Sequence, residues 1–152
     1  MSGVAPSMKI RNLAGRRVGI VSSSWHPEIC QALVAGAQRA LNQAKVTDIE
    51  IRYVAGSFEI PLVAKRMLEH ECDAVIAVGL VLRGETPHFD YVCRGVTDGV
   101  MKVMLETGKP IGFGVLMCDS LDQAIARSGV SGSKEDKGYD AAIAALDLIE
   151  SK

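Results

Sequence analysis

Residues 73–81 read Asp-Ala-Val-Ile-Ala-Val-Gly-Leu-Val, a nearly unbroken run of small and β-branched apolar side chains. Such a run predicts a strand that is covered on both faces, as in a parallel sheet with helices on either side. The run is far shorter than the ~20 apolar residues that a membrane-spanning helix needs. It therefore favours a globular α/β fold.

Other strands and helices follow in alternation on both sides of this run. Val18–Ser22 and Pro110–Leu116 are also short apolar runs, and Ile49–Val54 alternates with period two. Apolar residues at helical spacing mark Ile29–Leu41, Glu59–Glu69, Phe89–Val103, Leu121–Arg127 and Ala142–Ile149. This order predicts an α/β/α three-layer sandwich around a four-stranded parallel sheet, which is a flavodoxin-like arrangement. Residues 1–12 match neither pattern and are expected to form a flexible or interface arm.

The composition limits the possible function classes. The chain has 152 residues, with 17 basic and 18 acidic side chains, which predicts one domain over residues 1–152. The balanced charge argues against nucleic-acid and membrane partners. The four cysteines are scattered without metal-ligand spacing, so no metal site or disulfide framework is expected. No signal peptide is visible, and the cytoplasm is the expected location.

Ligands of open α/β sheets bind beyond the carboxyl ends of the strands. By this rule, four stretches are candidates for ligand binding: Ser22–Pro27, Ala55–Pro61, Leu80–His88 and Met117–Ser120. In the first, Trp25 lies at a loop tip, where it either stacks on a planar ligand or merely covers the end of the sheet. In the second, Ser57 and Phe58 offer backbone N–H groups and an aromatic face. Glu59 either accepts hydrogen bonds from a polyhydroxylated ligand or is an acidic residue that favours a helix N-terminus.

The third stretch combines a helix start with a histidine. Thr86 is typical of an N-cap and Pro87 of a first helical residue, which places His88 in the first turn. Free N–H groups in such a turn bind phosphate. His88 would transfer protons near neutral pH, although alone it could be an ordinary surface histidine. Gly112-Phe113-Gly114 lacks the third glycine of a dinucleotide fingerprint, and the chain has no P-loop.

Together these features resemble the lumazine synthase family of riboflavin biosynthesis, from about Val18 to Ile149. The resemblance rests most on residues 83–92, Arg-Gly-Glu-Thr-Pro-His-Phe-Asp-Tyr-Val. Further matching positions are Trp25, residues 56–61, residues 114–116, Gln123-Ala124, Arg127, Gly129 and Lys137-Gly138.

The resemblance implies a transferase that needs no cofactor and no metal. It would condense 5-amino-6-(D-ribitylamino)uracil with 3,4-dihydroxy-2-butanone 4-phosphate to 6,7-dimethyl-8-ribityllumazine, releasing phosphate and water. His88 would move the protons. The residues implied for the pyrimidine and its ribityl chain are Trp25, Ser57, Phe58, Glu59, Leu80, Val81, Leu82 and Phe113. Those implied for phosphate are Glu85, Thr86, Arg127 and Lys137.

The resemblance also implies a homo-oligomer whose sites lie at subunit interfaces. Phe113, Arg127 and Lys137 would come from the neighbouring subunit, and the N-terminal segment would add to a neighbour's sheet. The product would pass to riboflavin synthase. A pentamer or a pair of pentamers is expected, because the loop from Gly129 to Lys137 is longer than in many shell-forming members.

Two positions depart from the family's pattern. Met117 stands where members often have Thr, and Asp136 stands where Asn often precedes Lys-Gly. Lys134 competes with Lys137 for the phosphate role.

Three other functions remain compatible with these residues, since a fold does not determine function. They are a non-catalytic flavin- or lumazine-binding module, a shell-forming protein and a phosphate-sensing flavodoxin-like regulator.

Overall fold

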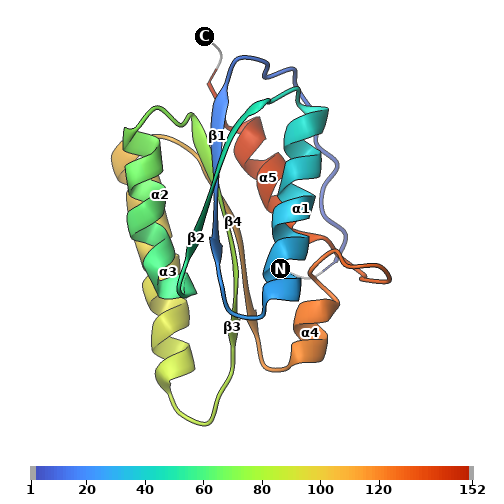
Figure 1. The fold of residues 1–152 in the computed structure, drawn as a ribbon, viewed down its shortest axis with the longest axis vertical. Helices are drawn as coiled ribbons and strands as arrows, with labels where there is room; N and C mark the ends of the chain where they lie inside the picture. Colours follow the sequence, from blue (N-terminus) through green and yellow to red (C-terminus); the bar gives the residue numbers. More distant parts are fainter. Residues whose placement is uncertain (1–2, 151–152) are drawn as a thin grey trace.

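The computed structural model describes residues 3–150, which form three layers. The middle layer is a parallel sheet in the order β2-β1-β3-β4. Its strands are β1 (Arg17–Ser23), β2 (Asp48–Val54), β3 (Ala74–Leu82) and β4 (Ile111–Cys118). Figure 1 shows α1 (Pro27–Gln43) and α5 (Lys137–Asp147) on one face, and α2 (Ile60–Glu69) and α3 (His88–Thr107) on the other. The predicted fold class is confirmed.

Strand β3 lies between two hydrophobic cores. Ala74, Ile76 and Val78 of β3 pack with α1 and α5, whereas Val75 and Ala77 pack with α2 and α3. All five are fully buried. Alternation of side chains across a strand sends successive residues to opposite faces. An apolar residue at every position is therefore what both cores require.

Helix boundaries differ from the prediction at α3 and at the two C-terminal helices. Thr86 is not the N-cap of α3: Pro87 occupies that position with helical dihedrals, and the helix begins at His88. The short α4 (Leu121–Ile125) ends two residues early. The last helix begins at Lys137, well before its apolar stripe, because its first turn is polar and capped by Asp136.

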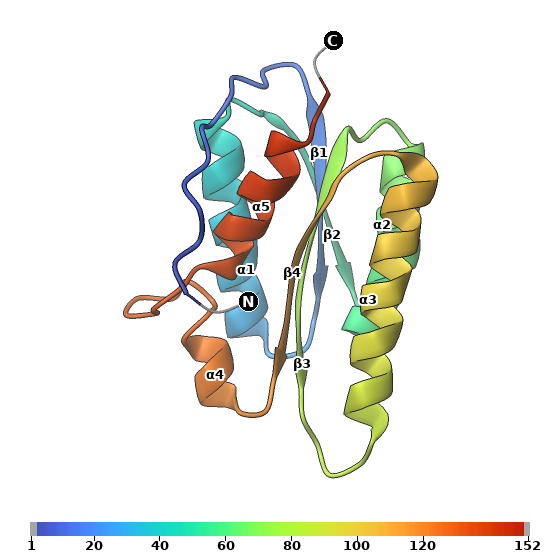
Figure 2. The same ribbon diagram turned by 180° about the vertical axis from the view of Figure 1, so that it is seen from behind.

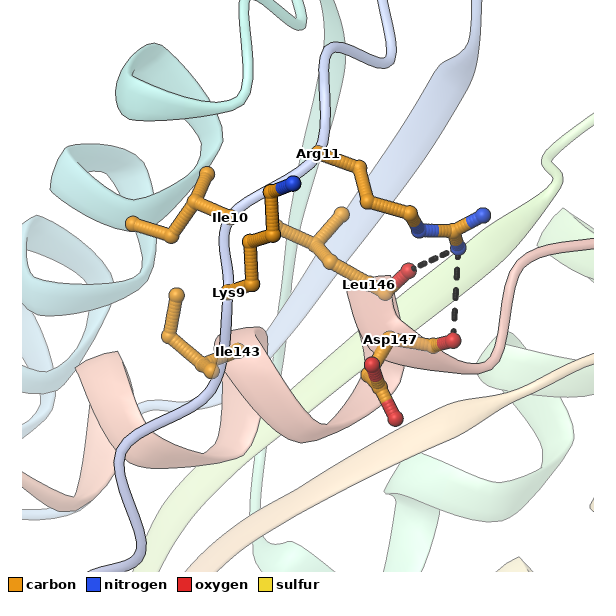
Figure 3. A pocket seen from close by; sticks show the side chains of 6 residues that line it. All are labelled: Lys9, Ile10, Arg11, Ile143, Leu146 and Asp147. Carbon is orange, nitrogen blue, oxygen red and sulfur yellow. Dashed lines mark hydrogen bonds between the residues drawn. The ribbon is translucent and has the colours of Figure 1, made fainter.

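Residues 3–12 of the predicted arm contain no strand or helix, and residues 1–2 of it lie outside the described residues. Figure 2 shows the N-terminal segment running along the outside of α1 and α5. The Arg11 guanidinium donates to the carbonyl oxygens of Leu146 (2.7 Å) and Ile149 (2.6 Å). Lys9, Ile10 and Arg11 enclose a dent of about 10 Å³ with α5 (Figure 3), room for one water molecule at most. Residues 9–11 of the arm therefore pack on α5 of their own chain.

Among residues 3–150, none of the helices combines the length and the apolar character that crossing a membrane requires.

Candidate active site

The ends of β1 and β3 meet where the strand order reverses, which is the point at which ligands of such sheets bind. The Ser23 hydroxyl accepts a hydrogen bond from the Leu80 N–H (3.3 Å). A Cβ placed on Gly79 would lie 2.6 Å from Ser23 Oγ and 2.9 Å from Ser57 Oγ. Only glycine allows this approach, so β1, β3 and the 3₁₀ turn η1 (Ser57–Glu59) converge here.

Trp25 and Glu59 both lie next to Gly56 at this edge. A Cβ on Gly56 would be 3.2 Å from a Glu59 carboxylate oxygen and 3.6 Å from the indole Nε1 of Trp25. The indole is 66% exposed, so its surface is open to a ligand. Its loop is held by the Ser24 hydroxyl, which donates to the Val54 carbonyl (2.7 Å).

The Glu59 carboxylate also has a local structural role. One of its oxygens accepts the Gly56 N–H (2.8 Å), which stabilises η1 at the start of α2. This role resembles the alternative that the sequence left open for Glu59, an acidic residue at a helix N-terminus. A carboxylate has further acceptor positions, and Glu59 is exposed, so a ligand can bind the remaining ones.

Phe58 packs on α3. A Cβ on Gly95 would lie 2.6 Å from Phe58 Cε1, so the ring rests on the backbone of this helix. The ring is still 58% exposed. The adjacent Ser57 is buried, and its hydroxyl has no hydrogen-bond partner among the described residues.

The loop after β3 carries the predicted phosphate turn. Leu80 is buried, and Val81 and Leu82 are half-buried, whereas Glu85, Thr86 and His88 are exposed at the end of the sheet. Thr86 Oγ1 accepts a hydrogen bond of 3.4 Å from the His88 N–H. A turn of exposed residues at the positive end of a 20-residue helix is suited to an anion.

Arg83 organises this loop, a role that the sequence analysis did not assign. Its Nε donates to Asp119 (2.6 Å), its Nη1 lies 3.5 Å from Asp90, and its guanidinium stacks 4.2 Å above the Phe89 ring. The hydrogen bond to Asp119 is the largest cause that raises the pKa of Arg83. The position of Arg83 directly after a strand was the only sequence signal for this role.

Arg127 and Lys137 are brought together by a short antiparallel bridge between Ser128 and Asp136. The Lys137 N–H donates to the Arg127 carbonyl (3.0 Å). Both cations contact the carboxylate of Glu135, and Lys137 also contacts Asp140 (3.6 Å). Burial raises the pKa of Asp140, although Lys137 opposes this shift. Lys134 is exposed.

Phe113 lies apart from the strand-end residues of its own chain. It is the third residue of β4, pairs with Ala77 and is 41% exposed between the buried Ile111 and Val115. Cys118 lies five residues further along the strand, a distance of about 16 Å at ~3.3 Å per residue. Phe113 is therefore far from the carboxyl end of the sheet.

Two depressions elsewhere on the molecule contain none of the predicted site residues. One is the dent under the N-terminal arm (Figure 3). The other is an open groove of about 450 Å³ between α2 and α3, lined by Lys65, Leu68, Glu69, Glu106, Thr107 and Lys109. Within residues 3–150, no group of three or more His, Cys, Asp or Glu side chains is arranged to hold a metal ion.

The chain is similar to known proteins along most of its length. Residues 15–152 match the family model described as 6,7-dimethyl-8-ribityllumazine synthase. A protein of Streptomyces coelicolor with that name is 49% identical over 147 residues, covering 96% of this chain and 91% of the relative. A protein of Paenarthrobacter aurescens with the same name is 51% identical over 130 residues, covering 86% of this chain and 80% of the relative.

Proposed function

The chain belongs to the 6,7-dimethyl-8-ribityllumazine synthase family and is a transferase of riboflavin biosynthesis. We propose that its complete active site forms between two copies of the chain. Each site condenses 5-amino-6-(D-ribitylamino)uracil with 3,4-dihydroxy-2-butanone 4-phosphate. The product is 6,7-dimethyl-8-ribityllumazine, and phosphate and water are released.

The pyrimidine binds at the switch point between β1 and β3. The exposed indole of Trp25 stacks on its ring, and the free positions of the Glu59 carboxylate accept hydrogen bonds from the ribityl hydroxyls. Backbone groups of Ser57, Phe58 and Leu80–Leu82 hold the rest of the molecule. The contact of Gly56 with both Trp25 and Glu59 supports this grouping.

The phosphate binds at the N-terminus of α3. Backbone N–H groups of the Glu85–Thr86 turn contact it from one subunit, and Arg127 and Lys137 of the neighbour supply positive charge. The pairing of both cations with one carboxylate supports Lys137 rather than Lys134 for this role.

His88 carries the proton transfers. Imine formation, loss of phosphate and ring closure each require a proton to move, and the imidazole is exposed beside the phosphate turn. Holding the two substrates in register supplies the larger effect, since effective molarities of ~10⁵–10⁸ M are reached by well-oriented reactants.

Phe113 is the observation that carries the interfacial site. An exposed aromatic ring about 16 Å from the strand ends cannot line its own chain's cleft, but it can close a neighbour's cleft. Such a head-to-tail contact closes into a ring, for which we propose a homopentamer. The outer edge of β2 has no partner strand within residues 3–150, which leaves space for a neighbour's N-terminal segment.

We place the enzyme in the cytoplasm and expect it to pass its product to riboflavin synthase. All four cysteines are free, which is typical of a reducing compartment. A non-catalytic binding module or a shell protein is not favoured, because relatives that match over nearly the whole chain are named as synthases.

Mixing of two defective variants tests the shared site. His88→Ala removes the base from a subunit's own cleft, and Arg127→Ala removes a cation from its neighbour's cleft. In a ring assembled from equal amounts of both, about a quarter of the interfaces contain a His88 and an Arg127. We expect unfolding and reassembly of the mixture to restore activity at low phosphate-substrate concentration. Activity no higher than the average of the separate variants would contradict an interfacial site.

A further inference from the structure

The Glu135 carboxylate contacts both cations that we assign to phosphate binding, Arg127 and Lys137. Glu135 Oε1 lies 3.0 Å from Lys137 Nζ, and Glu135 Oε2 lies 3.6 Å from Arg127 Nε. Each oxygen thus contacts a different cation. The Glu135 side chain is 24% exposed, compared with 43% for Arg127 and 26% for Lys137, so the carboxylate is the most buried of the three.

The backbone keeps Glu135 in this place. Its N–H donates to the Ala126 carbonyl (3.0 Å), and two residues later the Lys137 N–H donates to the Arg127 carbonyl (3.0 Å). These bonds flank the Ser128–Asp136 bridge. Arg127 is held in addition by its own Nη1, which donates to the Gln123 carbonyl (2.9 Å). The cluster of Arg127, Glu135 and Lys137 therefore belongs to a hydrogen-bonded ribbon between α4 and α5, formed by residues 126–128 and 135–137.

The charges of the cluster balance without any ligand. Arg127 and Lys137 are paired with Glu135 and Asp140, two positive with two negative groups. A phosphate oxygen needs the same pair of donors that the Glu135 carboxylate already engages. A phosphate that approaches these cations must therefore displace Glu135 or share the cations with it, and either costs binding free energy.

We propose that Glu135 is an internal counter-ion that occupies the phosphate-binding cations in the empty site and thereby sets the affinity for the phosphate-bearing substrate. This inference rests on the proposed phosphate role of Arg127 and Lys137. Glu135 limits how tightly phosphate is held, including the phosphate that the reaction releases.

Glu135→Gln in the assembled enzyme tests the proposal, because it removes the charge and keeps the shape. The measurements are the inhibition constant of inorganic phosphate and KM for each substrate. Partly exposed ion pairs are individually weak, so we expect the inhibition constant and KM for the phosphate substrate to fall about three- to tenfold. KM for the pyrimidine should stay unchanged. Added salt should reduce the difference from the wild type.

Glu106→Gln is the matched control. Glu106 also lies between two cations, 3.8 Å from Lys65 Nζ and 3.9 Å from Lys102 Nζ, but in the last turn of α3, whereas the predicted phosphate turn precedes the first turn of that helix. It should leave both phosphate measurements unchanged. Glu135→Asp, which keeps the charge on a shorter arm, should fall between the wild type and Glu135→Gln, and it provides a second variant if Glu135→Gln does not assemble.

Arg127→Ala and Lys137→Ala separate failure of this inference from failure of the proposed function. If both raise KM for the phosphate substrate while Glu135→Gln raises it or leaves it unchanged, Glu135 is not a competing anion and the counter-ion proposal is overturned. If neither alanine variant changes that KM, the proposed phosphate role of the two cations is itself wrong.

Discussion

At the scale of single residues, we propose that His88 carries the proton transfers, and its removal should slow the enzyme without stopping it. A positioned general base contributes typically ~10²–10⁴-fold, whereas orientation of the two substrates by the rest of the site is retained. We expect His88→Ala to lower kcat by about that range and to leave assembly unchanged. Steady-state kinetics with a sizing measurement check this.

His70→Ala provides the control for this variant. His70 is another exposed histidine, but it lies at the C-terminal end of α2, at the opposite end of the sheet. It should retain wild-type kcat. A loss of more than about a million-fold in assembled His88→Ala would contradict a purely proton-transferring role, since it exceeds what general acid–base catalysis supplies.

Candidate site residues were recognisable in the sequence where a local pattern marks them. Trp25 lies in the loop after a strand, His88 at the start of the helix after another, and Phe113 between two glycines of a strand. The roles of Arg83 and Glu135 were not predictable in this way. Arg83 depends on Asp119, which lies 36 residues further along the chain. Glu135 contacts Arg127 and Lys137 only because the folded ribbon brings both cations next to it.

At the scale of elements, sequence patterns predicted the strands better than the helix ends. β3 was found within one residue because its burial requires an apolar side chain at every position. The start of α5 was missed because its first turn is polar and its cap depends on tertiary contacts. Asp136 accepts the Tyr139 N–H (3.1 Å), pairs with Arg39 and fits against Gly129, where a Cβ would lie 2.6 Å from its Cγ.

Loss of this cap should destabilise the C-terminal part of the fold. Asp136→Ala removes an N-cap and an ion pair, so we expect the free energy of unfolding to fall by about 1–2 kcal/mol. The ribbon with Arg127 and Lys137 adjoins the cap, and KM for the phosphate substrate should rise as well. Chemical unfolding at fixed chain concentration measures the first effect, because assembly contributes to apparent stability.

Asp136→Asn separates the two contributions of Asp136. The amide oxygen still accepts the Tyr139 N–H, while the charge towards Arg39 is lost. Since N-caps of Asn and Asp are about equally effective, this variant should retain most of the stability. An equal loss in both variants would show that the ion pair, rather than the cap, stabilises the start of α5.

At the scale of the whole molecule, we propose that folding and activity belong to different units. One chain forms both hydrophobic cores around β3, yet it leaves several large side chains exposed on η1, α3, α4 and β4: Phe58, Tyr91, Met101, Leu105, Phe113, Leu121 and Ile125. Phe113 among them is the ring that we propose closes a neighbour's cleft. A chain can therefore be folded without possessing a complete site.

The native particle should accordingly lose activity when its ring dissociates, before its chains unfold. Five chains of 16.2 kDa make a particle of about 81 kDa, and a paired ring doubles this mass. We expect mild urea or dilution to lower turnover in proportion to the ring fraction seen by native mass spectrometry, while the far-ultraviolet circular dichroism is retained. The cause is the departure of the neighbour's Phe113, Arg127 and Lys137 from each cleft. Inorganic phosphate should delay both changes, because it binds only the assembled site. A folded single chain with full turnover would show that all the catalytic groups come from one subunit.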